Sequence, residues 1–367
     1  MPATPAPRPA PPAYDAARVE AAAALILTKL GSKPEDAATV AQDLVAADRE
    51  GIASHGVMLL PMYADRILKG SVSLRSEGTV VSDRGAAIVL DAENALGQLT
   101  ARQAVKLAVA RARELGMASV AVRNAFHFGT AGRYARLMAE QGCVGIVMSN
   151  TRPLMPATGG AEPLIGNNPL AIALPSAGDF PVEVDMAMSA TAMGKIRLAA
   201  AAGKSIPDDW AIDASGNPTT DPLAAIKGML LPASGPKGFG LAFAIDLLCG
   251  GLSDGAVGAE VRPLYGDAAD PYRCSHFFLA IDAQHFPPGD RFAQRVNEQA
   301  QRVSGSKKAP GVARVYAPGE LAFAARAASG SVVRLAPETV QRLIGTARRA
   351  GIDDADNLFT EKADALP

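Results

Sequence analysis

The sequence has few of the features that mark metal-binding, secreted or membrane proteins. Its three cysteines, Cys143, Cys249 and Cys274, are odd in number, lie far apart, and form neither a CxxC pair nor the spacing of a zinc site. The N-terminus lacks the apolar core of a signal peptide, and no later run approaches the ~20 apolar residues that span a bilayer. We therefore expect a cytoplasmic protein in a reducing compartment, with no metal and no membrane partner.

An excess of charge of either sign is also absent. Lys and Arg number 36 against 37 Asp and Glu, which leaves a net charge of −1. No global field attracts nucleic acid, so a small-molecule substrate is favoured over a nucleic-acid partner. The hydrophobic share of 49% and the charged share of 20% are typical of a folded globular protein. At ~100–200 residues per domain, the length suggests two or three domains.

The signatures of several common enzyme classes are missing as well. No GxGxxG fingerprint stands after a strand and before a helix, and neither a GxSxG elbow nor an HExxH motif is present. Carboxylates are plentiful, but no pair is singled out as the acid and base of a glycosidase. A nucleotide bound by this chain is therefore bound outside the usual dinucleotide fold.

Helical patterns dominate both ends of the chain. The Pro/Ala-rich residues 1–13 predict a disordered tail. Pro34 occupies a first-turn position of a predicted helix, and Ser54 and His55 lie at the predicted C-terminal end of the same helix. The predicted helices are residues 15–30, 33–52, 58–70, 292–305 and 337–351. We interpret residues 14–75 and 291–367 as one helical domain built from both ends.

The middle of the chain, residues 76–290, has a different sequence pattern. Short β-branched runs bounded by Gly, Asn, Pro or Asp predict strands within residues 78–94, 117–123, 143–150, 170–175 and 180–189. Helical patterns lie among them at residues 100–116 and 129–142. The predicted fold class is therefore mixed α/β (α+β).

Only four histidines are available for acid/base chemistry. His55, between Ser54 and Gly56, could donate a proton or merely cap a helix. His127 follows an apolar run and precedes a helix, a junction where helix N-termini collect anions, but a hydrogen bond to a neighbouring carbonyl explains it equally well. His276 and His285 flank an apolar run, for which we favour a structural role.

A glycine-rich stretch suggests a phosphate-binding site. Gly235, Gly238 and Gly240 surround Lys237, and a helix follows at once. A phosphate is bound well by backbone amides that glycine leaves accessible, by the positive N-terminal end of a helix and by a lysine side chain. The alternative is a flexible glycine loop with a solvated lysine.

Long blocks of the sequence resemble the malate/L-lactate dehydrogenase family of non-Rossmann NAD(P)H-dependent oxidoreductases. Relatives in that family include ureidoglycolate dehydrogenase, sulfolactate dehydrogenase, 2,3-diketogulonate reductase and Δ1-piperideine-2-carboxylate reductase. The blocks run in family order across roughly residues 15–325. They are AADREGIASHGV, AFHFGTAGRYARLMAEQGCVGIVMSN, GGAEPLIGNNPLAIALP, VDMAMSATAMGKI, IPDDWAIDASGNPTTDP, LLPASGPKGFGLAFAIDLLCGGL and APGE.

The resemblance implies a fold, an activity and a partner. The fold is a helical domain from both chain ends with a central cofactor-binding domain that contains a mixed sheet. The activity is reduction of a 2-oxo acid, or a related ketone or cyclic imine, by NADH or NADPH, with oxidation of a 2-hydroxy acid as the reverse. The partner is a second copy of the chain in a homodimer, with active sites near the subunit contact.

The resemblance also implies roles for individual residues. His55 becomes the proton donor and Ser54 its hydrogen-bonding neighbour, and a histidine with a pKa near ~6.5 can give a proton at neutral pH. Lys195 is expected to orient the acidic cluster or the substrate. The cofactor residues are His127, Phe128, Gly129, Asp185, Met186, Ala187, Lys237, Gly238, Pro318, Gly319 and Glu320. The substrate residues are Leu59, Asn167 and Met193.

One position departs from the family pattern. Many relatives read SHGxxR, with an arginine that clamps the substrate carboxylate, whereas this chain reads SHGVML and has Leu59 there. Either Arg152 or Lys195 supplies the cation, or the substrate has no carboxylate at that point. The second reading favours an imine reductase. A third hypothesis is a member that has lost catalysis and only binds a ligand.

Overall fold

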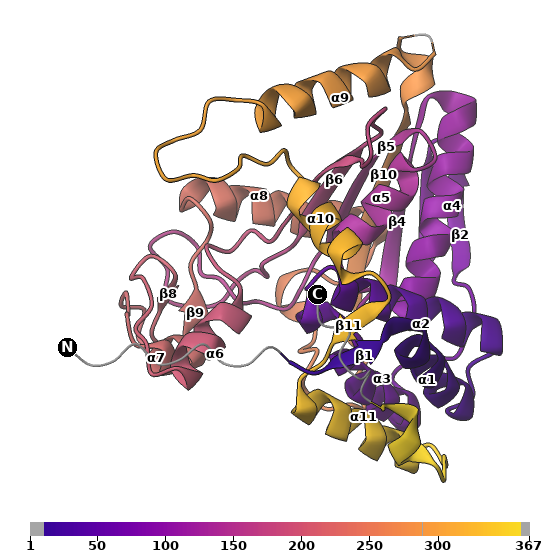
Figure 1. The fold of residues 1–367 in the computed structure, drawn as a ribbon, viewed down its shortest axis with the longest axis vertical. Helices are drawn as coiled ribbons and strands as arrows, with labels where there is room; N and C mark the ends of the chain where they lie inside the picture. Colours follow the sequence, from indigo (N-terminus) through magenta and orange to yellow (C-terminus); the bar gives the residue numbers. More distant parts are fainter. Residues whose placement is uncertain (1–10, 288, 361–367) are drawn as a thin grey trace. The chain divides into compact units, whose positions relative to one another are not determined.

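The computed structural model describes residues 11–287 and 289–360, which form two compact units (Figure 1). The helical unit contains the described residues up to Leu68 and from Ala322 onward, and the sheet unit is Lys69–Leu321. The sequence pattern places residues 69–75 and 291–321 in the helical domain. Both segments instead belong to the sheet unit, because Ser73 N donates to Asn94 O at 2.8 Å and Glu183 N donates to Pro318 O at 3.3 Å.

The helical unit is built from amphipathic helices that bury apolar faces. Asp15 caps the first helix by accepting a hydrogen bond from Arg18 N at 3.0 Å, and Pro34 opens the second in its first turn. Leu27 and Leu44 are completely buried. The elements are β1 (Ala13–Asp15), α1 (Ala16–Lys29), α2 (Pro34–Arg49), η1 (Ala53–His55), η2 (Val57–Leu59), α3 (Leu60–Lys69), β11 (Val332–Arg334), α11 (Pro337–Arg349) and η6 (Ala355–Leu358).

Two predictions about the N-terminal part need correction. Residues 1–10 of the predicted disordered tail lie outside the described residues, but Ala13 pairs with Arg334 in a two-stranded antiparallel sheet. The second predicted helix also ends earlier than expected, at Arg49. Ser54 and His55 lie in a separate 3-10 turn after Gly51, whose φ of 76° interrupts the helix.

The sheet unit contains a seven-stranded sheet in the order β2-β3-β4-β10-β5-β6-β7. Only β3 and β4 run parallel, and the other pairs are antiparallel. This mixed topology differs from the parallel sheet of a Rossmann fold, as the sequence predicted. The strands are β2 (Thr79–Arg84), β3 (Ala87–Asp91), β4 (Met117–Ala125), β5 (Cys143–Ser149), β6 (Leu170–Leu174), β7 (Val182–Met186) and β10 (Cys274–Asp282).

Both faces of this sheet are covered. On one face, α5 lies so close that a Cβ on Gly145 would come within 2.5 Å of Ala135 O. On the other, Ile146 and Met148 pack with Ile245 and Cys249 in an apolar core. The remaining elements of this unit are α4 (Gly97–Leu115), α5 (Ala131–Ala139), α6 (Met193–Ala201), β8 (Ala211–Ile212), α7 (Pro222–Lys227), β9 (Met229–Leu230), α8 (Pro236–Asp246), η3 (Leu247–Gly251), η4 (Gly258–Glu260), η5 (Ala283–His285) and α9 (Arg291–Ser304).

One last helix, α10 (Glu320–Ser329), begins at the end of the sheet unit and continues into the helical unit. No helix among the described residues is long and apolar enough to cross a bilayer.

Candidate active site

The Ser54–His55 pair occupies a short turn of the helical unit. Ser54 Oγ lies 2.9 Å from His55 Nδ1, and the two residues fall in the 3-10 turn Ala53–His55. This contact engages Nδ1 and restrains the ring, and the tautomer decides which of the two groups donates. The ring is half-buried, and this desolvation lowers the pKa of His55 below its ordinary value of 6.5. The turn therefore presents an oriented imidazole.

The backbone after His55 packs tightly against a buried carboxylate. Asp48, in the last turn of α2, accepts a hydrogen bond from Val57 N at 2.8 Å. A Cβ on Gly56 would lie 2.0 Å from Asp48 Oδ1, so any larger residue at this position would displace the carboxylate. Sequence reasoning missed Asp48. The available signal was its helical spacing, because Asp48 follows Leu44 by one turn on the buried face of α2.

Leu59, which stands at the position of the family's arginine, is almost completely buried. Its side chain is 2% exposed in the 3-10 turn Val57–Leu59. An arginine here would have to bury its charge. The departure at Leu59 is therefore matched by an apolar environment.

In the sheet unit, the HFG block forms the turn from β4 into α5. Phe128 is 4% exposed and stacks between His276, at 4.1 Å between ring centroids, and Tyr134, at 5.0 Å. Its ring therefore supports the turn from inside. His127 Nδ1 accepts a long hydrogen bond of 3.4 Å from Gly129 N. Gly129 has a φ of 91° and open space at its Cβ position, so its backbone is approachable.

Strand β7 and the APGE turn meet the start of α5. Asp185 Oδ2 accepts a hydrogen bond from Gly132 N at 2.9 Å, in the first turn of α5. Glu183 N donates to Pro318 O, and a Cβ on Gly319 would lie 2.9 Å from Glu183 N. The structure thus brings three predicted cofactor segments together, namely the HFG turn, residues 185–187 and the APGE turn.

Glu320 closes the APGE turn on itself. Its carboxylate accepts hydrogen bonds from Ala317 N at 2.9 Å and from Ser304 Oγ at 2.7 Å, and it pairs with Arg314. The Ala317 amide, followed by the other donors, lowers the pKa of Glu320. Its role as a direct cofactor contact stays a prediction, because these contacts already explain the residue.

The glycine-rich stretch leads into α8. Gly238 is required by packing, since a Cβ there would lie 2.1 Å from Ala233 O. Lys237 is exposed in the first turn of the helix. Ala233 N donates to Met188 O at 2.8 Å, which places the start of α8 beside the segment that follows Asp185, Met186 and Ala187.

The predicted substrate residues of the sheet unit lie near the same segment. Met188 N donates to Asn167 O at 2.8 Å, and Thr151 Oγ1 donates to Asn167 Oδ1 at 3.0 Å. Met193 is half-buried and packs on the apolar core. Lys195 is exposed on α6. The structure therefore groups Asn167 with Thr151 and the end of β7, while Ser54, His55 and Leu59 belong to the helical unit.

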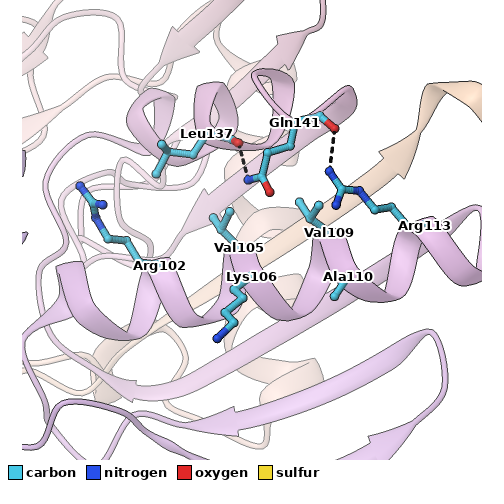
Figure 2. A pocket seen from close by; sticks show the side chains of 8 residues that line it. All are labelled: Arg102, Val105, Lys106, Val109, Ala110, Arg113, Leu137 and Gln141. Carbon is cyan, nitrogen blue, oxygen red and sulfur yellow. Dashed lines mark hydrogen bonds between the residues drawn. The ribbon is translucent and has the colours of Figure 1, made fainter.

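A separate groove of about 320 Å³ lies between α4 and α5 (Figure 2). Gln141 makes two hydrogen bonds at the edge of this groove. Its side-chain Nε2 donates to Leu137 O at 2.8 Å, and its main-chain carbonyl accepts a hydrogen bond from Arg113 at 3.5 Å. The lining residues are Arg102, Val105, Lys106, Val109, Ala110, Arg113, Leu137 and Gln141. None of these is a predicted site residue, and none is an acid, a nucleophile or a histidine.

Comparison with known proteins decides which family these residues belong to. The family model described as malate/L-lactate dehydrogenase matches residues 14–344. The chain belongs to the malate/L-lactate dehydrogenase family. The membership makes it an NAD(P)-dependent dehydrogenase or reductase.

Relatives and solved structures agree with this membership. The malate dehydrogenase of Pyrococcus abyssi is 39% identical over 306 residues, which cover 81% of this chain and 83% of the relative. The structure of sulfolactate dehydrogenase from Methanocaldococcus jannaschii matches with a TM-score of 0.89 and 31% identity, over 94% of this chain and 99% of that one. The structure of delta1-piperideine-2-carboxylate reductase from Pseudomonas syringae pvar. tomato matches with a TM-score of 0.81 and 30% identity, over 91% and 99%.

The family implies a nicotinamide dinucleotide, and the start of α8 fits its phosphates. The first turn of α5 is already occupied, because Asp185 and Glu183 fill the space at the Cβ position of Gly132. At the start of α8, by contrast, no described side chain caps the helix, and the Cβ position of Gly235 faces open space. Exposed Lys237 adds a positive charge. An anion therefore fits at the start of α8, whereas at the start of α5 the Gly132 amide already donates to Asp185.

Proposed function

We propose that the chain reduces a 2-oxo acid, or a related ketone, with His55 as proton donor, and oxidises the 2-hydroxy acid in reverse. The observation that carries this proposal is the 2.9 Å contact between Ser54 Oγ and His55 Nδ1, which orients the imidazole. A bound nicotinamide, NADH or NADPH, would supply the hydride. Lys237, the HFG turn, residues 185–187 and the APGE turn are the groups that would hold it.

The chemistry asked of the protein itself is proton transfer. As the carbonyl becomes an alkoxide, His55 Nε2 gives its proton to the oxygen, and the ring is left neutral. Ser54 keeps Nδ1 in place through the transfer. For oxidation the same neutral ring accepts the proton of the alcohol, and the lowered pKa of His55 favours this form at neutral pH.

A substrate panel tests the proposal. Pyruvate, larger 2-oxo acids, simple ketones and cyclic imines would each be offered with NADH and with NADPH, and cofactor absorbance would be followed. We expect 2-oxo acids to be reduced. A protein that binds neither cofactor in a fluorescence titration would instead be a ligand-binding member without catalysis.

An imine reductase is the second candidate function. It is favoured by the buried leucine at the position where many relatives have the carboxylate-clamping arginine. In that reading, Leu59 belongs to an apolar wall around a ring without a free carboxylate. Turnover of cyclic imines lacking a carboxylate, without turnover of 2-oxo acids, would select this function.

Arg152 is our candidate for the missing carboxylate clamp. It directly follows Thr151, which bonds to Asn167 and whose amide donates to Asn168 Oδ1 at 2.9 Å. Its guanidinium is exposed and makes a weak 3.4 Å hydrogen bond to Pro153 O. A planar guanidinium can hold a carboxylate through two parallel hydrogen bonds.

Arg152→Ala is therefore expected to raise KM for a 2-oxo acid by roughly 10–100-fold, the usual weight of charged hydrogen bonds. KM for a ketone without a carboxylate should stay unchanged in steady-state assays. Lys195→Ala tests the other candidate cation, and only the variant of the residue that clamps the carboxylate should raise KM for the 2-oxo acid selectively. An equal rise for both substrates in Arg152→Ala would remove the residue from carboxylate recognition.

Lys237→Ala is expected to weaken cofactor binding more than it slows turnover. A lysine at an uncapped helix start attracts phosphate charge equally in the ground state and the transition state, so its loss raises Kd and leaves kcat nearly intact. Fluorescence titration with NADH and NADPH measures the change. Lys106→Ala, which removes an exposed lysine from α4, should leave Kd unchanged. If Lys237→Ala binds both cofactors as tightly as the native protein does, the proposed phosphate-binding site at the start of α8 is wrong.

We also propose a homodimer. The surface of α8, η3 and the residue that follows η3 supports it, because five large apolar side chains remain exposed there by 37–56%. They are Leu241, Phe243, Leu247, Leu248 and Leu252. A concentration of exposed large apolar side chains on one segment is typical of a protein interface. The cytoplasm remains our proposed location.

A further inference from the structure

A carboxylate stands on the buried face of α2. Asp48 is 9% exposed and follows the completely buried Leu44 by one helical turn. Burying a charged or polar group on the apolar face of a helix costs free energy unless the group is hydrogen-bonded. The described donor to Asp48 is the backbone N–H of Val57, at 2.8 Å. The carboxylate thus bonds to the chain just beyond His55.

The contact falls where two 3-10 turns meet. The first turn closes with Gly56 N donating to Ala53 O at 3.0 Å, and the second with Leu59 N donating to Gly56 O at 3.0 Å. Between them Gly56 is extended, with φ −90° and ψ −158°. Asp48 Oδ1 occupies the place where a Cβ of Gly56 would be. The carboxylate therefore fixes the junction that directly follows His55.

The bond to Val57 does not depend on a charge partner. Burial raises the pKa of Asp48 to about 7, and the Val57 amide opposes this rise. The other charged groups at this end of α2 have their own contacts: Glu50 lies 3.9 Å from Arg326, and Arg49 donates to Gly330 O at 2.8 Å. Either protonation form of a carboxyl offers an oxygen to an N–H. An asparagine offers the same oxygen in the same shape.

We infer that Asp48 is a positioning residue for the proton donor. By accepting the Val57 amide and filling the space beside Gly56, it fixes the backbone of the turn and thereby the direction of the His55 ring. The inference rests on the proposed function, because it assigns Asp48 no contact with substrate or cofactor. Its effect passes through His55.

The test compares Asp48→Ala and Asp48→Asn, each made alone and together with His55→Ala. A misplacement of about 1 Å at a catalytic group costs up to ~10²-fold. We expect Asp48→Ala to lower kcat by roughly 10–10²-fold with an unchanged cofactor Kd, and Asp48→Asn to keep kcat within about 3-fold of the native value. In the His55→Ala background, Asp48→Ala should cause no further loss.

Asp36→Ala is the matched control for Asp48→Ala and should keep the native kcat. Asp36 is equally buried, at 8% exposed, but lies in the first turn of the same helix, about 18 Å away by helical rise. Native kcat in Asp48→Ala, an equal loss in both backgrounds, or a large loss in Asp48→Asn would overturn the inference. If Asp48→Ala does not fold by circular dichroism, Asp48→Leu, which keeps the branched side-chain shape but offers no oxygen to Val57 N, replaces it with the same expected loss of kcat. Full activity of His55→Ala would instead overturn the proposed function.

Discussion

Replacing His55 by alanine is expected to lower kcat for reduction by about 10²–10⁴-fold, the usual weight of a positioned acid. The affinity for NADH and NADPH should hardly change, because the predicted cofactor residues all belong to the sheet unit, whereas His55 belongs to the helical unit. Steady-state kinetics on the best substrate of the panel and a fluorescence titration measure the two quantities. A folded His55→Ala variant with native turnover would remove the assignment.

The pH dependence gives an independent check on His55. Reduction needs the protonated ring, so kcat/KM for reduction should fall as pH rises through the pKa of His55, which burial places below 6.5. Oxidation needs the neutral ring, so its kcat/KM should rise through the same value. His127→Ala is the matched control, since it removes a histidine from the cofactor segment and should mainly raise the cofactor Kd.

Glu183→Ala is expected to lower the free energy of unfolding by about 3–5 kcal/mol, because it leaves the charge of Arg136 buried without its carboxylate. Arg136 Nη1 lies 3.0 Å from Glu183 Oε1 and 2.8 Å from Oε2, and the two side chains are each 8% exposed. Urea unfolding followed by fluorescence measures the loss. The single tryptophan, Trp210, lies in the same sheet unit and reports on it.

The exposed pair of Arg111 and Asp83 provides the control. It also has two short contacts, of 3.0 Å and 2.9 Å, but it lies at the surface, where solvent screens the charges. Asp83→Ala should therefore shift the unfolding curve far less than Glu183→Ala. Equal shifts would mean that the buried pair contributes no more than a surface contact.

Much of the fold was predictable because its helices and most of its strands carry local signals. Pro34 at the start of α2 and the bounded β-branched runs of β4 to β7 needed no tertiary information. The central strand β10 was not predicted as a strand. Both of its faces are buried, with Phe277 on one face and Phe278 on the other, so it lacks the alternation that reveals a strand.

The candidate site residues could be predicted where a sequence motif marks them. They could not be predicted where tertiary packing determines the role of a residue. The SHG and HFG segments could be read from the chain, but the sequence did not indicate that Phe128 is a buried support for its turn. Gly238 looked like part of a phosphate loop, yet the carbonyl of Ala233 requires it. The Arg136–Glu183 pair joins α5 to β7, and only the folded chain brings those residues together.

The most direct test of the central claim is the fate of the hydride. Wild-type protein would be incubated with the best 2-oxo acid of the panel and with nicotinamide cofactor carrying deuterium at both C4 positions, and the product would be examined by mass spectrometry and NMR. The account predicts a 2-hydroxy acid with one deuterium on the carbon that carried the carbonyl. A product without deuterium at that carbon, formed at the native rate, would contradict it.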